Sequence, residues 1–204
     1  MDETKFLFNS WKTSLELAND RGFKVDTNYN KVSIKEFKFM INDKDSGIDI
    51  VCYEHNKDPN HMLYIKFILA LKIKPSSIKD IYEEINQKIS DTKKVDIILI
   101  LKSKPNNSIL KLEKDKSYTN IQIYWCKQLQ FNVTKHELVP KHVLLSDNET
   151  QNLIKEKNIT LEEIPFISRT DPVVKYFGAK KHQVFKIIRQ SETCGLYETY
   201  RIVV

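Results

Sequence analysis

The sequence contains little glycine and little cysteine. Only four glycines occur among 204 residues, and they form neither a Gly-x-x-x-x-Gly-Lys loop nor a Gly-x-Gly-x-x-Gly turn. Such loops wrap backbone N–H groups around phosphates, so their absence argues against nucleotide binding by these routes. The three cysteines, Cys52, Cys126 and Cys194, are far apart and form no Cys-x-x-Cys pair. We expect reduced thiols in an intracellular protein, with no disulfide, no zinc site and no thiol chemistry.

Long apolar runs are also missing. The N-terminus, MDETKFLFNSWK, lacks a basic region followed by an apolar stretch, and no apolar run approaches the length that crosses a bilayer. We therefore expect a soluble chain with no membrane partner. The 41% of apolar residues is enough to bury a core, so disorder is not expected.

The excess of positive charge is small. The 33 Lys and Arg residues stand against 27 Asp and Glu residues, which gives a formal net charge of +6 and a pI near 9.0. This balance is compatible with a nearby polyanion but is common to many proteins. The richness in Lys, Asn and Ile also indicates an AT-rich coding sequence. Charge alone therefore predicts no function.

Helices and strands alternate in the first part of the chain, which predicts an α/β domain. Apolar residues at helical spacing predict a helix from Glu3 to Arg21, ended at Gly22, and the Ser33–Glu36 capping box opens a shorter one through Phe39. The remaining predicted elements are paired strands over 48–53 and 63–71, a helix over 75–89, strands over 95–101 and 121–125, and a helical turn over 108–112.

The composition changes near Phe131, and a second, smaller α+β domain is predicted beyond it. A Ser146–Glu149 capping box opens a helix to Lys157, and Thr160 with Glu163 forms another box. A short helix runs from its N-cap Asp171, with Pro172 at its first position, to Gly178. Strands over 183–189 and 196–204 flank the loop QSETCG and predict a hairpin or a neighbouring pair of strands. We divide the chain into domains 1–130 and 131–204.

A metal-dependent nuclease is the main alternative suggested by the alternating elements. Clustered carboxylates would hold its metal ion, and the nearest candidates are Asp49, Glu54, Asp91 and Lys93. Asp91 and Lys93 fall in a polar turn before an apolar strand, so a solvated turn is the better interpretation. A free-standing basic DNA-binding protein is a further alternative, and it predicts DNA binding in isolation with a steep salt dependence.

Two histidines near the start of the second domain are the other candidate ligands. Six positions and Pro140 separate His136 from His142, which does not place both imidazoles on one helical face for a metal ion. Capping, packing or an interface contact is favoured over ligation.

The last third of the chain carries the most specific pattern. Residues 131–149 read FNVTKHELVPKHVLLSDNE, and residues 164–204 read IPFISRTDPVVKYFGAKKHQVFKIIRQSETCGLYETYRIVV. In order and spacing these blocks resemble the assembly domain of the fifth subunit shared among eukaryotic DNA-dependent RNA polymerases, which also has an archaeal counterpart. The resemblance includes the His-Glu-Leu-Val-Pro-x-His run and the later Asp-Pro-Val, Ser-Glu-Thr and Tyr-Arg elements.

Departures from the family pattern are small in this region. Lys175 stands where the family often has Arg, Cys194 stands at an alanine position, and His182 replaces a glycine. Upstream, the match is by topology and position. The family's Thr-Pro-Ser-Ala turn corresponds here to residues 104–107, Lys-Pro-Asn-Asn, which keep only the proline.

The resemblance implies a non-catalytic subunit that needs no cofactor and does not act alone. Its N-terminal domain would be a restriction-endonuclease-like jaw domain without an active site, close to downstream DNA. Its C-terminal assembly domain would dock on the largest polymerase subunit, alongside other polymerase subunits. The expected docking residues are His136, Pro140, His142, Asp171, Pro172, Tyr176, Arg189, Ser191, Glu192, Thr193, Tyr200 and Arg201. Tyr and Arg are enriched at interface hot spots. The residues alone favour a small self-contained core with a solvated rim, and the resemblance favours docking instead.

DNA contacts, where the resemblance implies them, should be electrostatic and independent of base sequence. The expected DNA-proximal residues are Lys102, Lys104, Asn106 and Asn107, which follow the central strand.

The long N-terminal domain, which the archaeal counterpart lacks, indicates a eukaryote or a large DNA virus as the source. The AT-rich coding bias and the diverged turn favour the virus. The protein would then occur in the virion and host cytoplasm, and in a cell it would occur in the nucleus.

Overall fold

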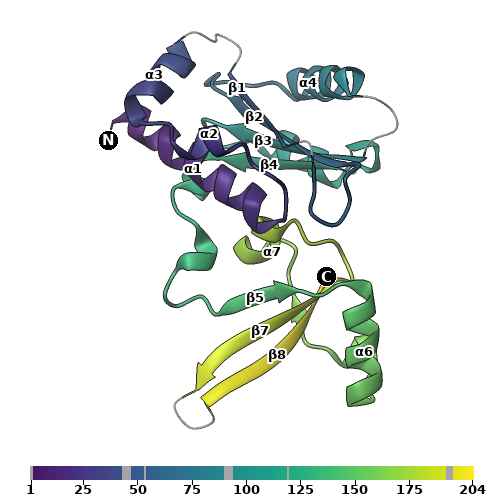
Figure 1. Ribbon diagram of the computed structural model, residues 1–204. Helices are drawn as coiled ribbons and strands as arrows, with labels where there is room; N and C mark the ends of the chain where they lie inside the picture. The colour runs from purple at the N-terminus through teal and green to yellow at the C-terminus, as the bar shows by residue number, and fades with distance from the viewer. Residues whose placement is uncertain (1, 43–46, 53, 90–93, 119, 192–194) are drawn as a thin grey trace. The chain divides into compact units, whose positions relative to one another are not determined.

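The computed structural model describes residues 2–42, 47–52, 54–89, 94–118, 120–191 and 195–204 (Figure 1). The chain forms two compact units, Met1–Phe131 and Asn132–Val204. Among the described residues, none of the helices combines the length and apolar character needed to cross a bilayer.

The N-terminal unit is built on a mixed sheet of four strands. The strands β1 (Ile48–Cys52), β2 (His61–Ile68), β3 (Lys94–Leu101) and β4 (Ile121–Trp125) lie side by side in this order (Figure 1). β1 is antiparallel to β2, whereas β2, β3 and β4 run parallel to one another. The predicted mixture of helices and strands is confirmed for this unit.

One face of the sheet is covered by α1 (Glu3–Asp20) together with α3 (Ile34–Asn42). Asp2 caps α1 by accepting a hydrogen bond from the Thr4 N–H at 3.1 Å, and the chain leaves the helix through Gly22 at φ +91°. The Trp11 side chain is fully buried, and the Phe37 ring from α3 lies 5.2 Å from it. The predicted Ser33–Glu36 capping box is present, but α3 extends beyond Phe39.

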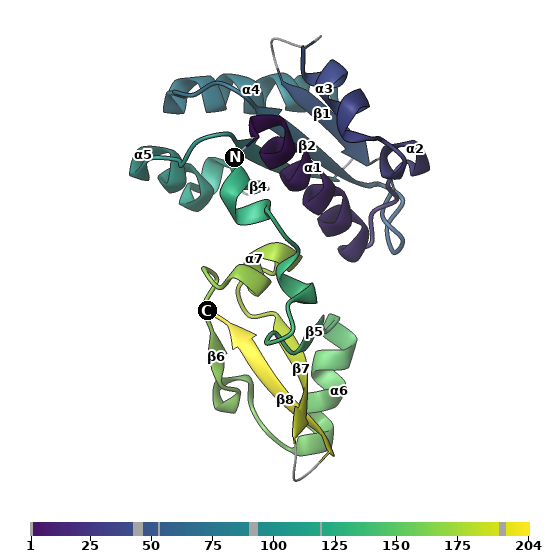
Figure 2. The same ribbon diagram turned by 90° about the vertical axis from the view of Figure 1, so that its left-hand side faces the viewer.

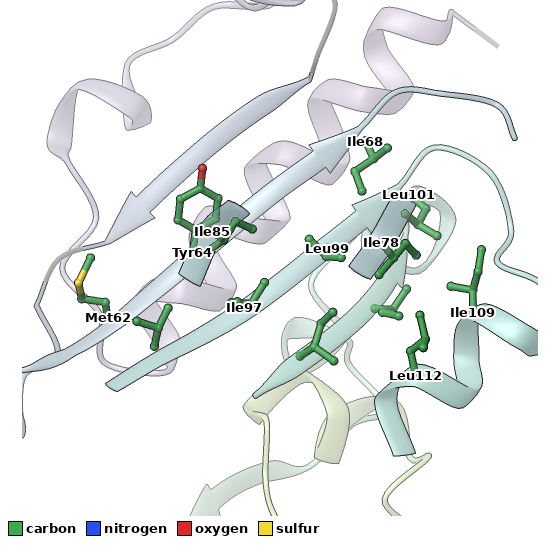
Figure 3. Packing of buried hydrophobic residues seen from close by; sticks show 13 residues of the cluster. Met62, Tyr64, Ile68, Ile78, Ile85, Ile97, Leu99, Leu101, Ile109 and Leu112 are labelled. Atoms are coloured by element: carbon green, nitrogen blue, oxygen red, sulfur yellow. The ribbon is translucent and has the colours of Figure 1, made fainter. Parts of the chain in front are cut away.

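The opposite face is covered by α4 (Pro75–Lys88) and, near β4, by α5 (Asn107–Leu110). Ile78 and Ile85 of α4 pack against Ile97 and Leu99 of β3, as Figure 3 shows. Each such side chain stabilises the fold by roughly 1.5–3 kcal/mol on burial. Successive residues of β3 face alternate sides and are buried on both, which explains the apolar run of this strand.

The second predicted strand is shorter at its end than the sequence indicated. β2 ends at Ile68, whereas the prediction extended it to Leu71. Ile68 is the last residue with a partner on β3, Leu101, so the backbone that follows has no ladder to join. Leu71 is consequently 69% exposed, and this part of the prediction was wrong.

Short helical segments complete the N-terminal unit. α2 (Thr27–Asn30) is capped by Asp26 and was not predicted. The predicted helical turn after Pro105 is formed by α5 and the 3₁₀ segment η1 (Lys111–Lys114). Further 3₁₀ segments are η2 (Lys116–Tyr118) and η3 (Cys126–Leu129).

The C-terminal unit contains a second four-stranded sheet. β5 (Lys141–Leu144), β7 (Val184–Ser191), β8 (Gly195–Val203) and β6 (Phe166–Ile167) lie in this spatial order. β7 and β8 pair antiparallel, so the predicted hairpin is confirmed. β5 and β6 were not predicted, because both are very short and their partners are distant in sequence.

Helices cover the second sheet and enclose its core. Figure 2 shows α6 (Asp147–Lys157) beside the hairpin, and Leu153 of α6 packs with Val184 and Ile202. α7 (Pro172–Phe177) packs Val174 against the buried Phe185. The two other predicted capping boxes are present, although the box at Thr160 opens only a 3₁₀ segment, η5 (Leu161–Glu163). A further 3₁₀ segment, η4 (Val133–Lys135), opens the unit.

Candidate interaction surfaces

Both histidines at the start of the C-terminal unit make local hydrogen bonds. His136 is exposed, and its Nδ1 accepts a hydrogen bond from the Leu138 N–H at 3.2 Å. His142 Nδ1 lies 2.7 Å from the Pro140 carbonyl oxygen. A carbonyl oxygen can only accept, so Nδ1 of His142 carries the proton. These contacts shape the loop that leads into β5.

Asp171, Pro172 and Tyr176 build the short helix α7. The Asp171 carboxylate accepts a hydrogen bond from the Val173 N–H at 2.8 Å, and Pro172 occupies the first helical position. The Tyr176 ring is only 3% exposed, and its edge packs against Phe177 at 5.6 Å. Tyr176 is therefore buried in the described structure.

The hairpin presents the other expected docking residues. Arg189 is exposed and lies opposite Tyr197 in the ladder. Arg201 Nη1 donates to the Phe166 carbonyl oxygen at 3.1 Å, which ties β8 to β6. The Lys157 ammonium lies 5.7 Å from the centre of the Tyr200 ring. Ser191 ends β7, and the predicted residues Glu192 and Thr193 lie outside the described residues.

Large apolar side chains are exposed on this unit. Leu138 is 84% exposed, Leu196 is 73% exposed and Phe166 is 61% exposed, and they come from the loop before β5, from β8 and from β6. Sequence reasoning assigned none of the three a docking role. The signal was present for Leu196, an apolar residue at the start of β8 that directly follows the sequence QSETCG.

The four predicted residues of the candidate DNA-proximal turn differ in their contacts and exposure. Lys102 forms an ion pair with Glu3, and its side chain is only 24% exposed. The Asn106 side-chain oxygen accepts from the Ile109 N–H at 2.9 Å and caps α5. Lys104, Asn106 and Asn107 are exposed. Three of the four predicted residues therefore face solvent, and one of these three, Asn106, also caps α5.

A depression of about 310 Å³ lies beside this turn. It is lined by Lys104 and by Lys72, which sequence reasoning missed, together with Leu71, Ser103 and Asn106. The depression sits at the carboxyl ends of the parallel strands β2 and β3, the edge where open α/β sheets present their ligand sites.

The nuclease candidates are paired with cations. Asp49 accepts hydrogen bonds from Lys66 Nζ at 3.1 and 3.4 Å, and Glu54 forms an ion pair with Lys24. Asp91 and Lys93 lie outside the described residues. Within the part of the chain that the structure describes, no three His, Cys, Asp or Glu side chains are placed to hold a metal ion.

Two buried thiols carry no sign of reactivity. Burial raises the pKa of Cys52 and of Cys126 to about 11 each, so both thiols are protonated near neutral pH. Cys194 lies outside the described residues.

Sequence reasoning also missed a cluster of histidines at the amino ends of β2 and β3. His61 Nε2 donates to Asp96 Oδ2 at 2.8 Å, and the His55 ring lies 5.5 Å from the His61 ring. His55 Nε2 donates to the Arg21 carbonyl oxygen at 2.9 Å, and its Nδ1 accepts from the Lys57 N–H at 3.1 Å. The Phe23 ring packs edge-on against both histidines.

Two family models match separate parts of the chain. The family model described as RNA polymerase Rpb5, C-terminal domain, matches residues 131–203, and the model described as RNA polymerase Rpb5, N-terminal domain, matches residues 1–85.

Curated relatives agree with both models. The subunit RPABC1 of DNA-directed RNA polymerases I, II and III from Caenorhabditis elegans is 32% identical over 210 residues, which cover 99% of this chain and 97% of the relative. Subunit 5B of the DNA-directed RNA polymerases IV and V from Arabidopsis thaliana is 28% identical over 94% of this chain and 87% of its own length. These relatives give no support to the predicted viral source. The prediction drawn from the C-terminal motifs is confirmed: the chain belongs to the Rpb5 family of RNA polymerase subunits.

Proposed function

We propose that this protein is an architectural subunit of a multisubunit DNA-dependent RNA polymerase. Its C-terminal unit docks on the largest subunit, and its N-terminal unit serves as a jaw domain near downstream DNA. The protein works inside the assembled enzyme, without a cofactor, in the nucleus of a cell. Family membership supports the subunit role, and the coverage of both units supports a function that uses the whole chain.

Membership of the Rpb5 family is the main support for docking, and the exposed apolar side chains of the C-terminal unit are candidates for the contact. Leu138, Phe166 and Leu196 are large apolar side chains exposed to solvent on this unit. Single exposed apolar residues are common on protein surfaces, whereas a contiguous apolar patch marks an interaction site, so these three residues serve as positions to test. Tyr197 and Arg189 lie opposite one another on the hairpin and belong to types enriched at hot spots.

Docking is tested by affinity purification of the tagged protein at high salt, followed by mass spectrometry. We expect the two largest polymerase subunits in near-equal amounts. Leu196→Asp combined with Tyr197→Asp should lower the recovery of these subunits roughly tenfold or more, because each hot-spot side chain contributes ~2 kcal/mol or more to binding. Phe39→Asp is the matched control, because it replaces an exposed apolar residue of the N-terminal unit. Recovery of the protein alone would refute the proposal.

The proposed contact with DNA uses the Lys104 turn and the neighbouring Lys72. Both side chains are exposed beside one depression, as expected for residues that contact phosphates without reading bases. In the assembled enzyme, Lys72→Glu with Lys104→Glu should lower crosslinking to downstream DNA. Lys38→Glu on α3 is the control, because this exposed lysine lies away from the depression. Unchanged crosslinking by the double variant would exclude this contact.

The proposal also holds that the jaw domain has a restriction-endonuclease-like fold without an active site. A mixed sheet with helices on both faces supports the fold, and the cation partners of Asp49 and Glu54 support the loss of metal chemistry. Purified protein with Mg²⁺ should leave plasmid DNA intact. Cleavage that Asp49→Ala abolishes would instead establish the nuclease.

A further inference from the structure

The outer edge of β1 is left open by the described residues. β1 is the end strand of its sheet, and β2 occupies its other side. Just after β1, the chain is paired with the segment that follows α1. The Lys24 N–H donates to the Glu54 carbonyl oxygen at 2.9 Å, and the Asn56 N–H donates to the Gly22 carbonyl oxygen at 2.8 Å. Phe23 and His55 form an antiparallel bridge between these bonds.

A groove begins where this pairing ends. Beyond Lys24 the chain turns into α2 and leaves β1. The resulting depression, about 390 Å³, has Lys24, Val25, Asp26 and Tyr29 on one side and Asp49, Val51 and Glu54 on the other. An edge strand offers a row of backbone donors and acceptors. An extended chain lying in this groove would continue the ladder that residues 22–24 start.

The groove is acidic although the protein is basic. Its lining holds three carboxylates, Asp26, Asp49 and Glu54, against one cation, Lys24. The buried Lys66 neutralises part of the charge on Asp49 at 3.1 Å, and Lys24 pairs with Glu54. The net charge of the whole chain is +6, so the excess of carboxylates in this lining is opposite in sign to the overall charge. Its charge favours lysine or arginine in an occupant, and Val25 and Val51 favour small apolar side chains between them.

We propose that this groove binds an extended segment of a partner protein. The segment pairs its backbone with β1 as an added strand and directs lysine or arginine side chains to Asp26, Asp49 and Glu54. This binding site lies beyond the proposed polymerase role, since it uses neither the hairpin nor the Lys104 turn. Its test is therefore independent of docking and of DNA contact.

The probe is a fluorescein-labelled peptide of alternating valine and lysine, titrated into the full-length protein at low salt. We expect saturable binding below about 1 mM, with amide chemical-shift changes confined to β1 and residues 24–29. Asp49→Asn with Glu54→Gln should weaken binding about threefold to tenfold, because partly exposed charge pairs contribute modestly. Glu83→Gln, an exposed carboxylate of α4 outside the groove, should leave binding unchanged.

Backbone pairing is tested with the same peptide methylated on alternate amide nitrogens. We expect this peptide to lose binding, because the methylated edge cannot donate to β1. The proposal would be overturned by equal binding of the two peptides, by a titration that does not saturate, or by amide chemical-shift changes outside the groove. The carboxylates could alternatively guard the edge against self-association. Dimerisation of the Asp49→Asn/Glu54→Gln variant, with no peptide binding by the parent protein, would establish that role and exclude ours.

Discussion

The Ser10 hydroxyl donates a hydrogen bond to the Cys126 carbonyl oxygen at 2.8 Å, joining positions 116 residues apart. Gln130 Nε2 donates in turn to Ser10 Oγ at 2.7 Å and to the Cys126 carbonyl oxygen at 2.8 Å. Ser10 is fully buried. These bonds fasten α1 to the segment that follows β4, so the first helix and the end of the N-terminal unit are stabilised together.

Ser10→Ala should destabilise the N-terminal unit by about 1–3 kcal/mol, because it removes two hydrogen bonds of the buried hydroxyl, one to Cys126 and one from Gln130, each worth roughly 0.5–1.5 kcal/mol. The measurement is urea denaturation followed by tryptophan fluorescence, since Trp11 is adjacent and buried. Ser108→Ala, an exposed serine in α5, is the control and should change the free energy of unfolding by less than about 0.5 kcal/mol. Equal effects of the two changes would contradict the role assigned to Ser10.

The ion pair between Asp49 and Lys66 should matter more than the one between Glu54 and Lys24. The Lys66 side chain is 9% exposed, whereas the Lys24 and Glu54 side chains are 64% and 52% exposed. Asp49→Ala should cost about 2–4 kcal/mol because it leaves a buried ammonium group unpaired. Glu54→Ala should cost at most about 1 kcal/mol.

A second variant separates the charge from the packing in this pair. Lys66→Met fills a similar volume without a charge, so Asp49→Ala in that background should cost much less than in the parent protein. Chemical denaturation of the four proteins gives the coupling free energy. A coupling near zero would show that the pair is no more than a surface contact.

His61 should make folding stability depend on pH. Burial lowers the pKa of His61 from its ordinary value of 6.5, and the Asp96 carboxylate opposes this shift only in part. The unfolded chain therefore binds the proton more readily than the folded chain. Stability should be greatest above pH 6.5 and should fall as the pH drops below it.

The matched variant for this prediction is His61→Gln, which can still donate a hydrogen bond to Asp96. It should flatten the decline of unfolding free energy between about pH 7.5 and about pH 5, and the other histidines should contribute equally to both proteins. Denaturation curves across this range provide the test. Parallel curves for the two proteins would rule out a contribution from His61.

The elements that the sequence predicted best are those fixed by neighbours in the chain. The capping box of Ser146 and Glu149 and the cap provided by Asp171 are local contacts, and both helices begin where these residues place them. β5 and β6 depend on Ile187 and Ile202, which lie far away in sequence, so their short segments carry no comparable signal.

The same distinction applies to the candidate sites. The ladder between β1 and β2 sets Lys66 opposite Asp49, and His61 meets Asp96 across two strands, so neither pair follows from sequence spacing. The exposure of Lys72 beside Lys104 also depends on where two strands end together. Family motifs identified the family through residues 131–204, but they could not show which side chains face inward, as Tyr176 does.

His182 occupies a backbone conformation that favours glycine. Its φ is +71°, in the left-handed region, and its N–H donates to the Val203 carbonyl oxygen at 2.9 Å. His182→Gly should therefore stabilise the C-terminal unit by about 0.5–1 kcal/mol, because relief of the strain exceeds the added entropy of the unfolded chain. Lys181→Gly, at the adjacent exposed residue with an ordinary φ, should instead destabilise the unit. Thermal unfolding of the two variants gives the comparison, and a loss of stability in His182→Gly would mean that the imidazole makes contacts worth more than the strain.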